Sequence, residues 1–254
     1  MSLERLSYSD LALFDSCELR FHLERVLRIG RPPGAVGGPT SFGSAVHTAL
    51  QLASAGRPPE AARLEAIARR FRLDGSLRAD MEVAVDRFVR SGLARSLDGH
   101  DAVRREWAFT LRLDPEGAPV DLAGSMDAYA RTAATGLVVD YKSGSSGDDE
   151  VLRVRYRTQA QCYALVALAD GCSEVEVVFC RPQVVDERGE MQEIGYRFLA
   201  GDAAGIERDI LTRRDRMVAS ARRPRDQWSR QECGGCSASG TLCPRTEQTA
   251  SSGV

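Results

Sequence analysis

The chain has 254 residues, of which 43% are apolar and 28% are charged, and its net charge at pH 7 is −2. This balance is typical of a globular protein and excludes the disordered and collagen-like classes. The longest apolar run, over residues 162–169, is too short to span a bilayer, and the N-terminal residues lack the apolar core of a signal peptide. We therefore expect a cytoplasmic protein. Of its 34 basic residues, only Lys142 is a lysine.

Helical spacing of apolar residues dominates the first part of the chain. A helix that begins at Ser9 is expected to run to about residue 28, and a loop rich in Gly and Pro follows it. Further helices are then predicted over residues 43–55, 58–73 and 77–97. These helices precede every predicted strand, so they form a helical block ahead of the sheet.

Beyond residue 100 the apolar pattern changes to that of strands. Strands are predicted over 103–113, 120–130 and 137–142, and their short turns indicate an antiparallel meander. A helix over 150–169, strands over 175–180 and 191–198, and a helix over 202–221 complete the core. The sequence thus predicts an α/β fold with a mixed sheet flanked by helices, followed by a disordered tail over 246–254.

Two aspartates and the lysine form the first candidate site. Asp140 and Lys142 lie two residues apart on a strand, so their side chains share a face, and a hairpin brings Asp127 beside Asp140. Two carboxylates, a backbone carbonyl and waters are the oxygen ligands that Mg²⁺ or Mn²⁺ prefers. A lysine beside them could activate a water that attacks a phosphodiester. A surface ion pair would give the same short D-x-K pattern.

Four further residues are candidates for the same site. His47 stands at the start of a helix, and an imidazole ligand would favour Mn²⁺ over Mg²⁺. Glu106 could extend the acidic site, although an exposed strand carboxylate is the simpler interpretation. Gln159 and Tyr163 are four residues apart and share one helix face, from which they could reach the metal, a phosphate or Lys142. For His47 an ordinary core or surface histidine is the simpler interpretation, and a plain amphipathic helix explains Tyr163 equally well.

The cysteines form the second candidate site. Cys233, Cys236 and Cys243 have a spacing typical of metal sites, and Cys17 on the first helix is the natural fourth ligand. Four thiolates fit either a structural Zn²⁺ or an iron–sulfur cluster. Such a site would join the two ends of the chain. The remaining thiols lie among apolar residues and are interpreted as small core residues: Cys162, Cys172 and Cys180.

Taken in order, these motifs resemble those of the RecB-like nucleases of the PD-(D/E)xK superfamily. The resemblance is strongest to members with an iron–sulfur cluster, such as the CRISPR adaptation exonucleases and the nuclease domain of AddB. It covers residues 6–245, and the motifs that carry it are the first helix with its cysteine (6–21), G-x-x-x-H (43–47), G-x-x-D (124–127), D-x-K (140–142), Q-x-x-x-Y (159–163) and the closing cysteines with the proline that follows (233–244). Glu18 stands where the family commonly has proline after the first cysteine, and the last cysteine gap is six residues rather than five.

The resemblance implies a restriction-endonuclease-like core in a single domain over residues 1–245. Within it, residues 43–97 form a helical insertion, 103–199 the catalytic core, and residue 17 with 233–243 a cysteine cluster lobe. The implied ligands of Mg²⁺ or Mn²⁺ are His47, Asp127, Asp140 and the carbonyl of Tyr141. Asp127, Asp140 and Lys142 are the implied catalytic residues, and Gln159 and Tyr163 support the site and contact substrate. The four site cysteines hold a 4Fe–4S cluster, with Zn²⁺ as the less favoured occupant, and DNA contacts are expected from Arg153, Arg155 and Arg157.

The implied function is that of a metal-dependent DNA nuclease, an exonuclease on DNA ends or single strands. It would hydrolyse phosphodiesters in recombination and repair or in CRISPR adaptation, with a helicase or a CRISPR integrase as partner. A non-catalytic DNA-binding or scaffold module of a helicase–nuclease or integrase complex is the alternative. The motifs leave open the polarity of digestion, exonuclease against endonuclease action, and DNA against RNA.

Overall fold

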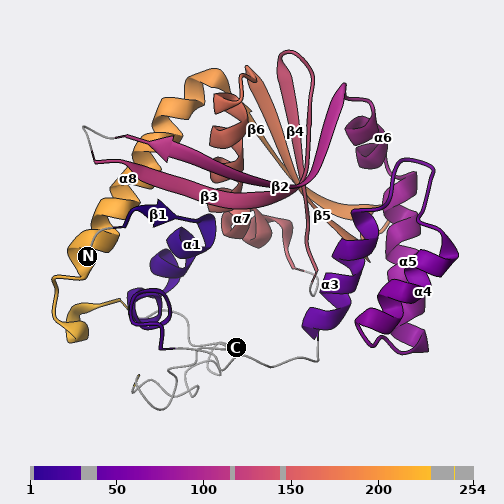
Figure 1. Ribbon diagram of the computed structural model, residues 1–254, viewed down its shortest axis with the longest axis horizontal. Coiled ribbons are helices and arrows are strands. Elements are labelled where there is room, and N and C mark those ends of the chain that lie inside the picture. The colour runs from indigo at the N-terminus through magenta and orange to yellow at the C-terminus, as the bar shows by residue number, and fades with distance from the viewer. Residues whose placement is uncertain (1–2, 30–38, 115–117, 144–146, 230–242, 244–254) are drawn as a thin grey trace. The chain divides into compact units, whose positions relative to one another are not determined.

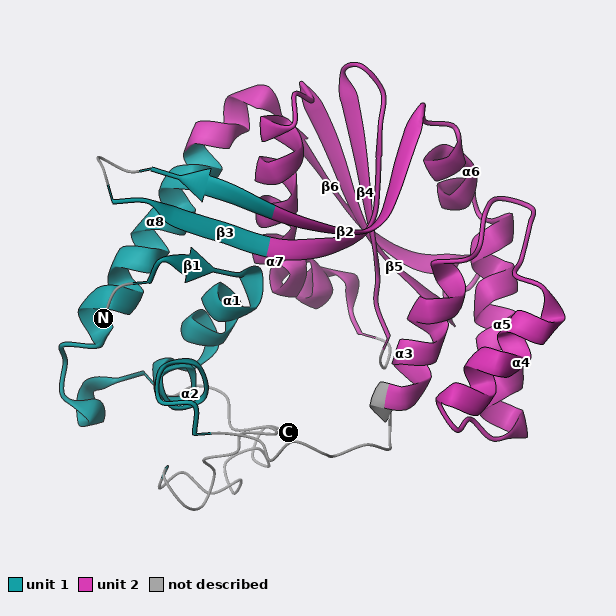
Figure 2. Cartoon of the chain, in the orientation of Figure 1, with its two compact units in different colours: residues 1–35, 110–123, 205–254 teal, residues 36–109, 124–204 magenta. Residues whose placement is uncertain are grey.

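The computed structural model describes residues 3–29, 39–114, 118–143, 147–229 and 243 (Figure 1). The chain divides into two compact units (Figure 2). Unit 1 comprises residues 1–35, 110–123 and 205–254, and unit 2 comprises residues 36–109 and 124–204. The single domain over residues 1–245 stays a prediction, and the predicted tail over 246–254 lies outside the described residues. Among the described helices, none is long and apolar enough to cross a membrane.

The helices of unit 2 that precede the sheet are α3 (Pro39–Leu50), α4 (Ala61–Arg70), α5 (Gly75–Arg90) and α6 (Gly92–Asp98). The prediction of a single helix over 77–97 is wrong, because the helix is interrupted at Ser91, between α5 and α6. The backbone there is extended, and the Ser91 side chain accepts a hydrogen bond from the Ala94 N–H at 3.0 Å. Serine competes for backbone hydrogen bonds and is a preferred N-cap, so it ends one helix and begins the next.

The strands are β2 (Ala102–Leu113), β3 (Val120–Arg131), β4 (Thr135–Tyr141), β5 (Glu174–Val185) and β6 (Met191–Leu199). They lie in the order β3-β4-β5-β6, and β2 pairs with β3. The β3–β4 and β5–β6 pairs are antiparallel, whereas β4 and β5 are parallel. Helix α7 (Asp149–Ala169) makes the crossover that a parallel pair requires. The predicted mixed sheet with flanking helices is thereby confirmed.

Strand β4 is covered on both faces. Leu137, Val139 and Tyr141 belong to a core cluster that also contains residues of α3, α4, α5 and α6. Asp140 points the other way, where residues of α7 contact it. The strand is therefore buried along nearly its whole length, as expected for a strand with helices on both sides. Three free thiols are buried as core residues, as predicted: Cys162, Cys172 and Cys180.

Unit 1 contains a two-residue strand, β1 (Arg5–Leu6), which pairs in parallel with the beginning of β3. The helices that follow are α1 (Tyr8–Ser16), α2 (Glu18–Phe21) and the π-helix η1 (His22–Val26). Near the other end of the chain lie α8 (Ala203–Ser220), which belongs to unit 1 from Gly205 on, and the 3₁₀ turn η3 (Arg225–Gln227); the 3₁₀ turn η2 (Ala200–Asp202) belongs to unit 2. The continuous helix predicted from Ser9 to residue 28 is wrong. Ser7 is the N-cap, in a capping box with Asp10, and the extended backbone of Cys17 interrupts the helix.

Glu18 ties the two ends of unit 1 together. Its buried carboxylate accepts hydrogen bonds from Nη2 of Arg223 at 2.7 and 2.8 Å and from the Ser229 N–H at 2.9 Å. Cys17 and Cys243 belong to one buried hydrophobic cluster that also contains Leu19 and Leu23. Trp228 packs against this cluster. The glutamate in place of the family's proline is thus part of the contact between the first helices and the C-terminal segment.

Candidate active site

The β3–β4 hairpin brings the two predicted carboxylates together. Ala128 pairs with Val139, so the next step of the antiparallel register places Asp127 opposite Asp140. Oδ2 of Asp127 accepts a hydrogen bond from the backbone N–H of Tyr141 at 2.7 Å. The hairpin thus brings the two aspartates side by side.

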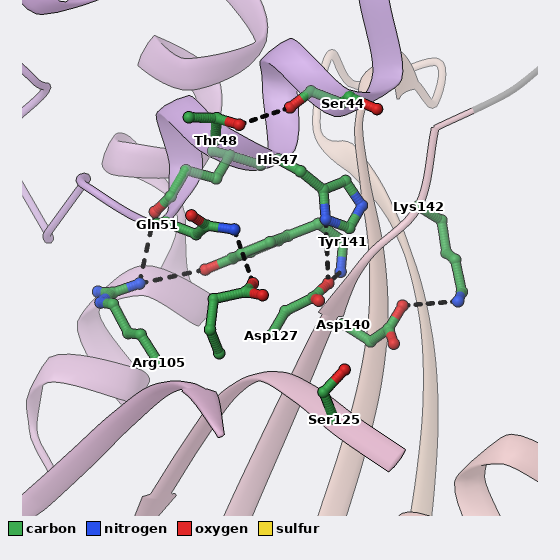
Figure 3. Close-up of polar contacts among 12 residues, drawn as sticks. Ser44, His47, Thr48, Gln51, Arg105, Ser125, Asp127, Asp140, Tyr141 and Lys142 are labelled. Atoms are coloured by element: carbon green, nitrogen blue, oxygen red, sulfur yellow. Dashed lines mark hydrogen bonds and ion pairs between the residues drawn. The ribbon is translucent and has the colours of Figure 1, made fainter. Parts of the chain in front are cut away.

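Asp140 and Lys142 belong to a network that α7 completes. Nζ of Lys142 lies 2.7 Å from Oδ1 of Asp140 and donates to Oε1 of Gln159 at 2.9 Å (Figure 3 shows the ion pair). The Gln159 amide in turn donates to Oδ2 of Asp140 at 2.8 Å, and the Tyr163 hydroxyl lies 2.9 Å from the same oxygen and 2.8 Å from the Ser125 carbonyl. Because the amide carbonyl faces the ammonium and its N–H₂ faces the carboxylate, Gln159 holds the charged pair in one arrangement.

His47 approaches Asp127 from α3. Its Nδ1 lies 3.5 Å from Oδ2 of Asp127 (Figure 3). Strand β2 holds this helix: Arg105 donates to the Leu50 and Ala53 carbonyls at 3.4 and 2.8 Å, and Gln51 donates to Glu106 at 2.7 Å. Glu106 is an exposed carboxylate on a strand, as the simpler interpretation predicts, and its hydrogen bond from Gln51 connects β2 to the end of α3. Its left-handed backbone (φ 49°) is unusual for a strand residue.

The surroundings of Asp127 disfavour its negative charge, so a cation bound beside this carboxylate would be stabilising. Burial, followed by the negative charge of Asp140, raises the pKa of Asp127 to about 6, although His47 and the Tyr141 N–H act in the opposite direction. Oδ1 of Asp140 is buried and accepts no hydrogen bond from the described residues; it faces the Lys142 ammonium. Two desolvated carboxylates side by side are costly unless a positive charge lies between or beside them.

The predicted ligands come together in pairs. His47 contacts Asp127, and Lys142 contacts Asp140, while Tyr141 links the two aspartates through its N–H. Within the described ranges, no three His, Cys, Asp or Glu side chains lie close enough to one another to hold one metal ion. The donors present, two carboxylates and a backbone carbonyl, nevertheless have the hard-oxygen chemistry of a Mg²⁺ or Mn²⁺ site.

Two aromatic residues of the site were not predicted. Nζ of Lys142 lies 5.4 Å from the centre of the Tyr156 ring and 5.2 Å from that of Phe179, and these two rings stack on each other. Tyr156 precedes Gln159 by three residues on α7, a spacing that points it to the same side. Phe179 pairs with Asp140 across the parallel β4–β5 ladder, which the sequence does not reveal. Both rings are close enough to make cation–π interactions with the Lys142 ammonium.

The three arginines predicted to contact DNA differ in their surroundings. Arg153 donates to the Gly195 carbonyl at 2.7 Å and packs over the Tyr196 ring, so its side chain is bound to β6. Arg155 and Arg157 are exposed on α7. A role in DNA binding stays a prediction for all three.

The glycines of the G-x-x-x-H and G-x-x-D motifs have a packing role. A Cβ at Gly43 would lie 2.2 Å from Oγ and 2.7 Å from Cβ of Ser143, in the segment directly after Lys142. A Cβ at Gly124 would lie 2.8 Å from the ring of Phe109, which packs edge-on against Tyr163. Both glycines therefore allow a close approach that sets a neighbouring site residue.

If the site cleaves phosphodiesters, as the sequence resemblance implies, replacing Gly43 with alanine is expected to reduce cleavage about 10- to 100-fold, because the clash separates α3 and its His47 from the segment that carries Lys142. Initial cleavage rates, with the melting temperature measured alongside, test this. Gly205→Ala is the matched control, since a Cβ there meets nothing within 4 Å. The second change Ser143→Gly should restore activity to Gly43→Ala, and a failure of this rescue would contradict the proposed clash.

Comparisons with known proteins identify the family to which the sequence is similar. The sequence matches the profile of the PD-(D/E)XK nuclease superfamily over residues 5–244. It is 30% identical over 145 residues to a chain of the ATP-dependent helicase/nuclease of Bacillus licheniformis, in an alignment that covers 48% of this chain and 12% of that protein. The chain thus spans a small part of that relative. It also aligns with the crystal structure of SSO0001, with a TM-score of 0.46 and 16% sequence identity over 96% of this chain and 88% of the other.

Proposed function

Because this chain belongs to the PD-(D/E)XK nuclease superfamily, we propose that it is a metal-dependent deoxyribonuclease that acts on DNA ends or single strands. Nuclease function at the level of the family follows from that membership, and the substrate and the metal are the proposal. The single observation that carries it is the network in which Gln159 holds Lys142 against Asp140 while Asp127 lies opposite on the hairpin.

In the proposed mechanism Asp127, Asp140 and the Tyr141 carbonyl would hold Mg²⁺ or Mn²⁺, and His47, which contacts Asp127, would be a further ligand. When bound, such an ion supplies charge for the phosphoryl oxygens and favours ionisation of an attacking water. Lys142 would orient that water, and its ammonium would donate a hydrogen bond to the phosphate oxygen on which negative charge develops. Gln159 and Tyr163 keep the Asp140 carboxylate in place through their hydrogen bonds to Oδ2.

The test is the degradation of labelled DNA in Mg²⁺ or Mn²⁺ by the wild type and by the variants Lys142→Ala and Asp127→Ala. Cleavage should vanish in both variants and on addition of EDTA. Asp121→Ala is the matched control, because this aspartate lies on the same strand but pairs with the exposed Arg112. Cleavage that persists in both site variants, once contaminating nucleases are removed, would refute the proposal.

Exonuclease action is supported only by the family resemblance and needs its own experiment. A linear single strand and its closed circular form present the same phosphodiesters but differ in the presence of ends. An exonuclease should degrade the linear strand and leave the circle intact. Rapid cutting of the circle would establish an endonuclease instead.

The alternative, a binding or scaffold module, gains support from the B. licheniformis relative, since the aligned part is a small fraction of that helicase/nuclease chain. We also propose a helicase partner and a role in repair or in CRISPR adaptation, and these proposals likewise rest on similarity to known proteins. DNA binding without cleavage under several divalent metals would favour this alternative. The intact network around Lys142 favours the enzyme.

For the cysteines we propose a cluster held by Cys17, Cys233, Cys236 and Cys243. Cys17 and Cys243, from the two ends of the chain, lie in one buried cluster, which supports a shared site; Cys233 and Cys236 lie outside the described residues. A bound cluster would link the chain ends. Anaerobic purification tests its nature, since a 4Fe–4S cluster is brown and a Zn²⁺ site is colourless.

A further inference from the structure

Unit 1 contains a cavity of about 310 Å³ beside the short strand β1. Three arginines line it: Arg5 from β1, Arg25 from η1 and Arg28 just after η1. Asp10 of α1 is also part of the lining, together with apolar side chains. We call this cavity the arginine pocket.

The arginine pocket carries an excess of positive charge. Asp10 is the one carboxylate of its lining, and it is already saturated: Oδ1 pairs with Arg25 at 3.1 Å, and Oδ2 accepts from the N–H and the hydroxyl of Ser7 at 3.0 and 2.6 Å. Among the described residues, Arg5 and Arg28 have no carboxylate within 4.0 Å, although Asp121, which is paired with Arg5 across β1 and β3 and bonded to Arg112, is near enough for the charge of Arg5 to lower its pKa. Three cations against one anion leave the lining with two excess positive charges in a chain whose net charge is −2.

Arg25 and Arg28 lie in a segment with unusual backbone geometry. Arg25 lies in the π-helix, which is closed by hydrogen bonds from the Leu27 N–H to the His22 carbonyl and from the Ile29 N–H to the Leu23 carbonyl, both at 2.8 Å. Arg28 follows in the left-handed conformation, with φ 53°. Such a conformation is unfavourable for a residue with a side chain, and π-turns occur often at functional sites. This backbone places the exposed side chains of Arg25 and Arg28 at the same pocket.

The chemistry of the lining selects its ligand. Guanidinium groups match the oxygens of a phosphate, and the apolar lining, which includes Leu6 and Phe21, suits a sugar or a base. The volume is at the small end of ligand pockets, which suits a single nucleotide. We propose that the arginine pocket binds a phosphate of single-stranded DNA, one nucleotide at a time. This inference rests on the proposed function, in which such a strand is the substrate.

The experiment measures binding separately from cleavage. In a Lys142→Ala background with EDTA, a fluorescent oligothymidylate is titrated with the full-length protein and its anisotropy recorded at several salt concentrations. The double change Arg5→Gln and Arg28→Gln should weaken binding about tenfold near 0.1 M salt. It should also reduce the slope of log K against log salt by about 0.7 for each phosphate that the protein no longer neutralises.

The matched control is the double change Arg69→Gln and Arg72→Gln in unit 2. It removes the same charge from exposed arginines outside the arginine pocket, and Arg72 has the same φ of 53° as Arg28. Equal weakening by both pairs, or none by the pocket pair, would overturn the proposal. Displacement of the strand by millimolar inorganic phosphate alone would assign the pocket to free phosphate and overturn it too.

Circular dichroism and the single change Arg28→Gln guard against a folding defect, because the single variant keeps two of the three arginines and should show an intermediate loss of affinity. A wild type that cleaves nothing under any metal, while the pocket pair still weakens strand binding, would refute the nuclease and leave the arginine pocket standing. Cleavage by the wild type with strand binding untouched by the pocket pair would refute the pocket alone.

Discussion

Replacing Lys142 with arginine is expected to lower cleavage by about 100-fold or more, although the positive charge is retained. The ammonium fits between Oδ1 of Asp140 at 2.7 Å and Oε1 of Gln159 at 2.9 Å, with the Tyr156 and Phe179 rings on its other side. A guanidinium is planar, larger and permanently protonated, so it cannot place a single donor at this point or exchange a proton with a water. Every other basic residue of the chain is already arginine.

The measurement is the initial rate of DNA cleavage at saturating substrate, with strand affinity determined in EDTA. The rate should fall and the affinity should stay within about twofold, since the charge is kept. The reverse change Arg69→Lys, at an exposed position of α4 outside the site, is the matched control and should leave both the rate and the affinity unchanged. Near-normal activity of Lys142→Arg would show that the lysine is incidental.

Replacing Asp127 with asparagine is expected to abolish cleavage and at the same time stabilise the metal-free protein. The carboxylate is largely buried beside Asp140, and its pKa is raised to about 6 from the ordinary value of 3.8. That difference corresponds to about 1–3 kcal/mol of unfavourable free energy in the ionised folded state at neutral pH. Asparagine removes the charge and can still accept the hydrogen bond from the Tyr141 N–H.

The sign of this effect gives it a pH dependence. Above pH 6 the aspartate is ionised in both the folded and the unfolded chain, so the full cost is present. Between pH 6 and 3.8 the folded chain binds the proton more readily, and the cost disappears as the pH falls. The stability gain of Asp127→Asn should therefore be largest above pH 6 and vanish near pH 4.

Urea unfolding in EDTA at pH 7.5 and at pH 4.5 measures the gain, and Mg²⁺ should raise the melting temperature of the wild type only. Asp121→Asn serves as control, because the pKa of Asp121 is lowered by its hydrogen bond with Arg112 and its loss should be neutral or slightly destabilising. If Asp127→Asn were less stable than the wild type at pH 7.5, this would refute the inference that the ionised Asp127 side chain destabilises the folded protein.

Local patterns in the sequence were sufficient for the centre of the site. The period of two along a strand places Asp140 and Lys142 on one face, and the short turn after β3 places Asp127 opposite Asp140; both relations are confirmed by the contacts of the hairpin. The period of α7 likewise predicted that Gln159 and Tyr163 share a face, and both contact Asp140. Each of these relations depends on residues close in the chain.

Other features depended on partners far away in the chain. The parallel pairing of β4 with β5 places Phe179 beside Asp140, and the clamp of Arg105 and Glu106 on α3 sets the position of His47. Neither follows from hydrophobic period or capping, because the chain between the partners does not determine how they meet. The break at Cys17 has the same origin in part, since the buried Glu18 that follows it is held by Arg223 and Ser229.

The sequence by itself therefore determined the order of the motifs, the hairpin with its carboxylates and the singular lysine, because these depend on local periodicity and spacing. Only the tertiary structure decided which side chains contact Lys142, namely the rings of Tyr156 and Phe179, and how closely Gly43 of α3 approaches Ser143. Within unit 1, it alone decided that three arginines line one pocket. Those features arise from packing between distant segments, where complementary shape and charge, rather than any repeating pattern, select the neighbours.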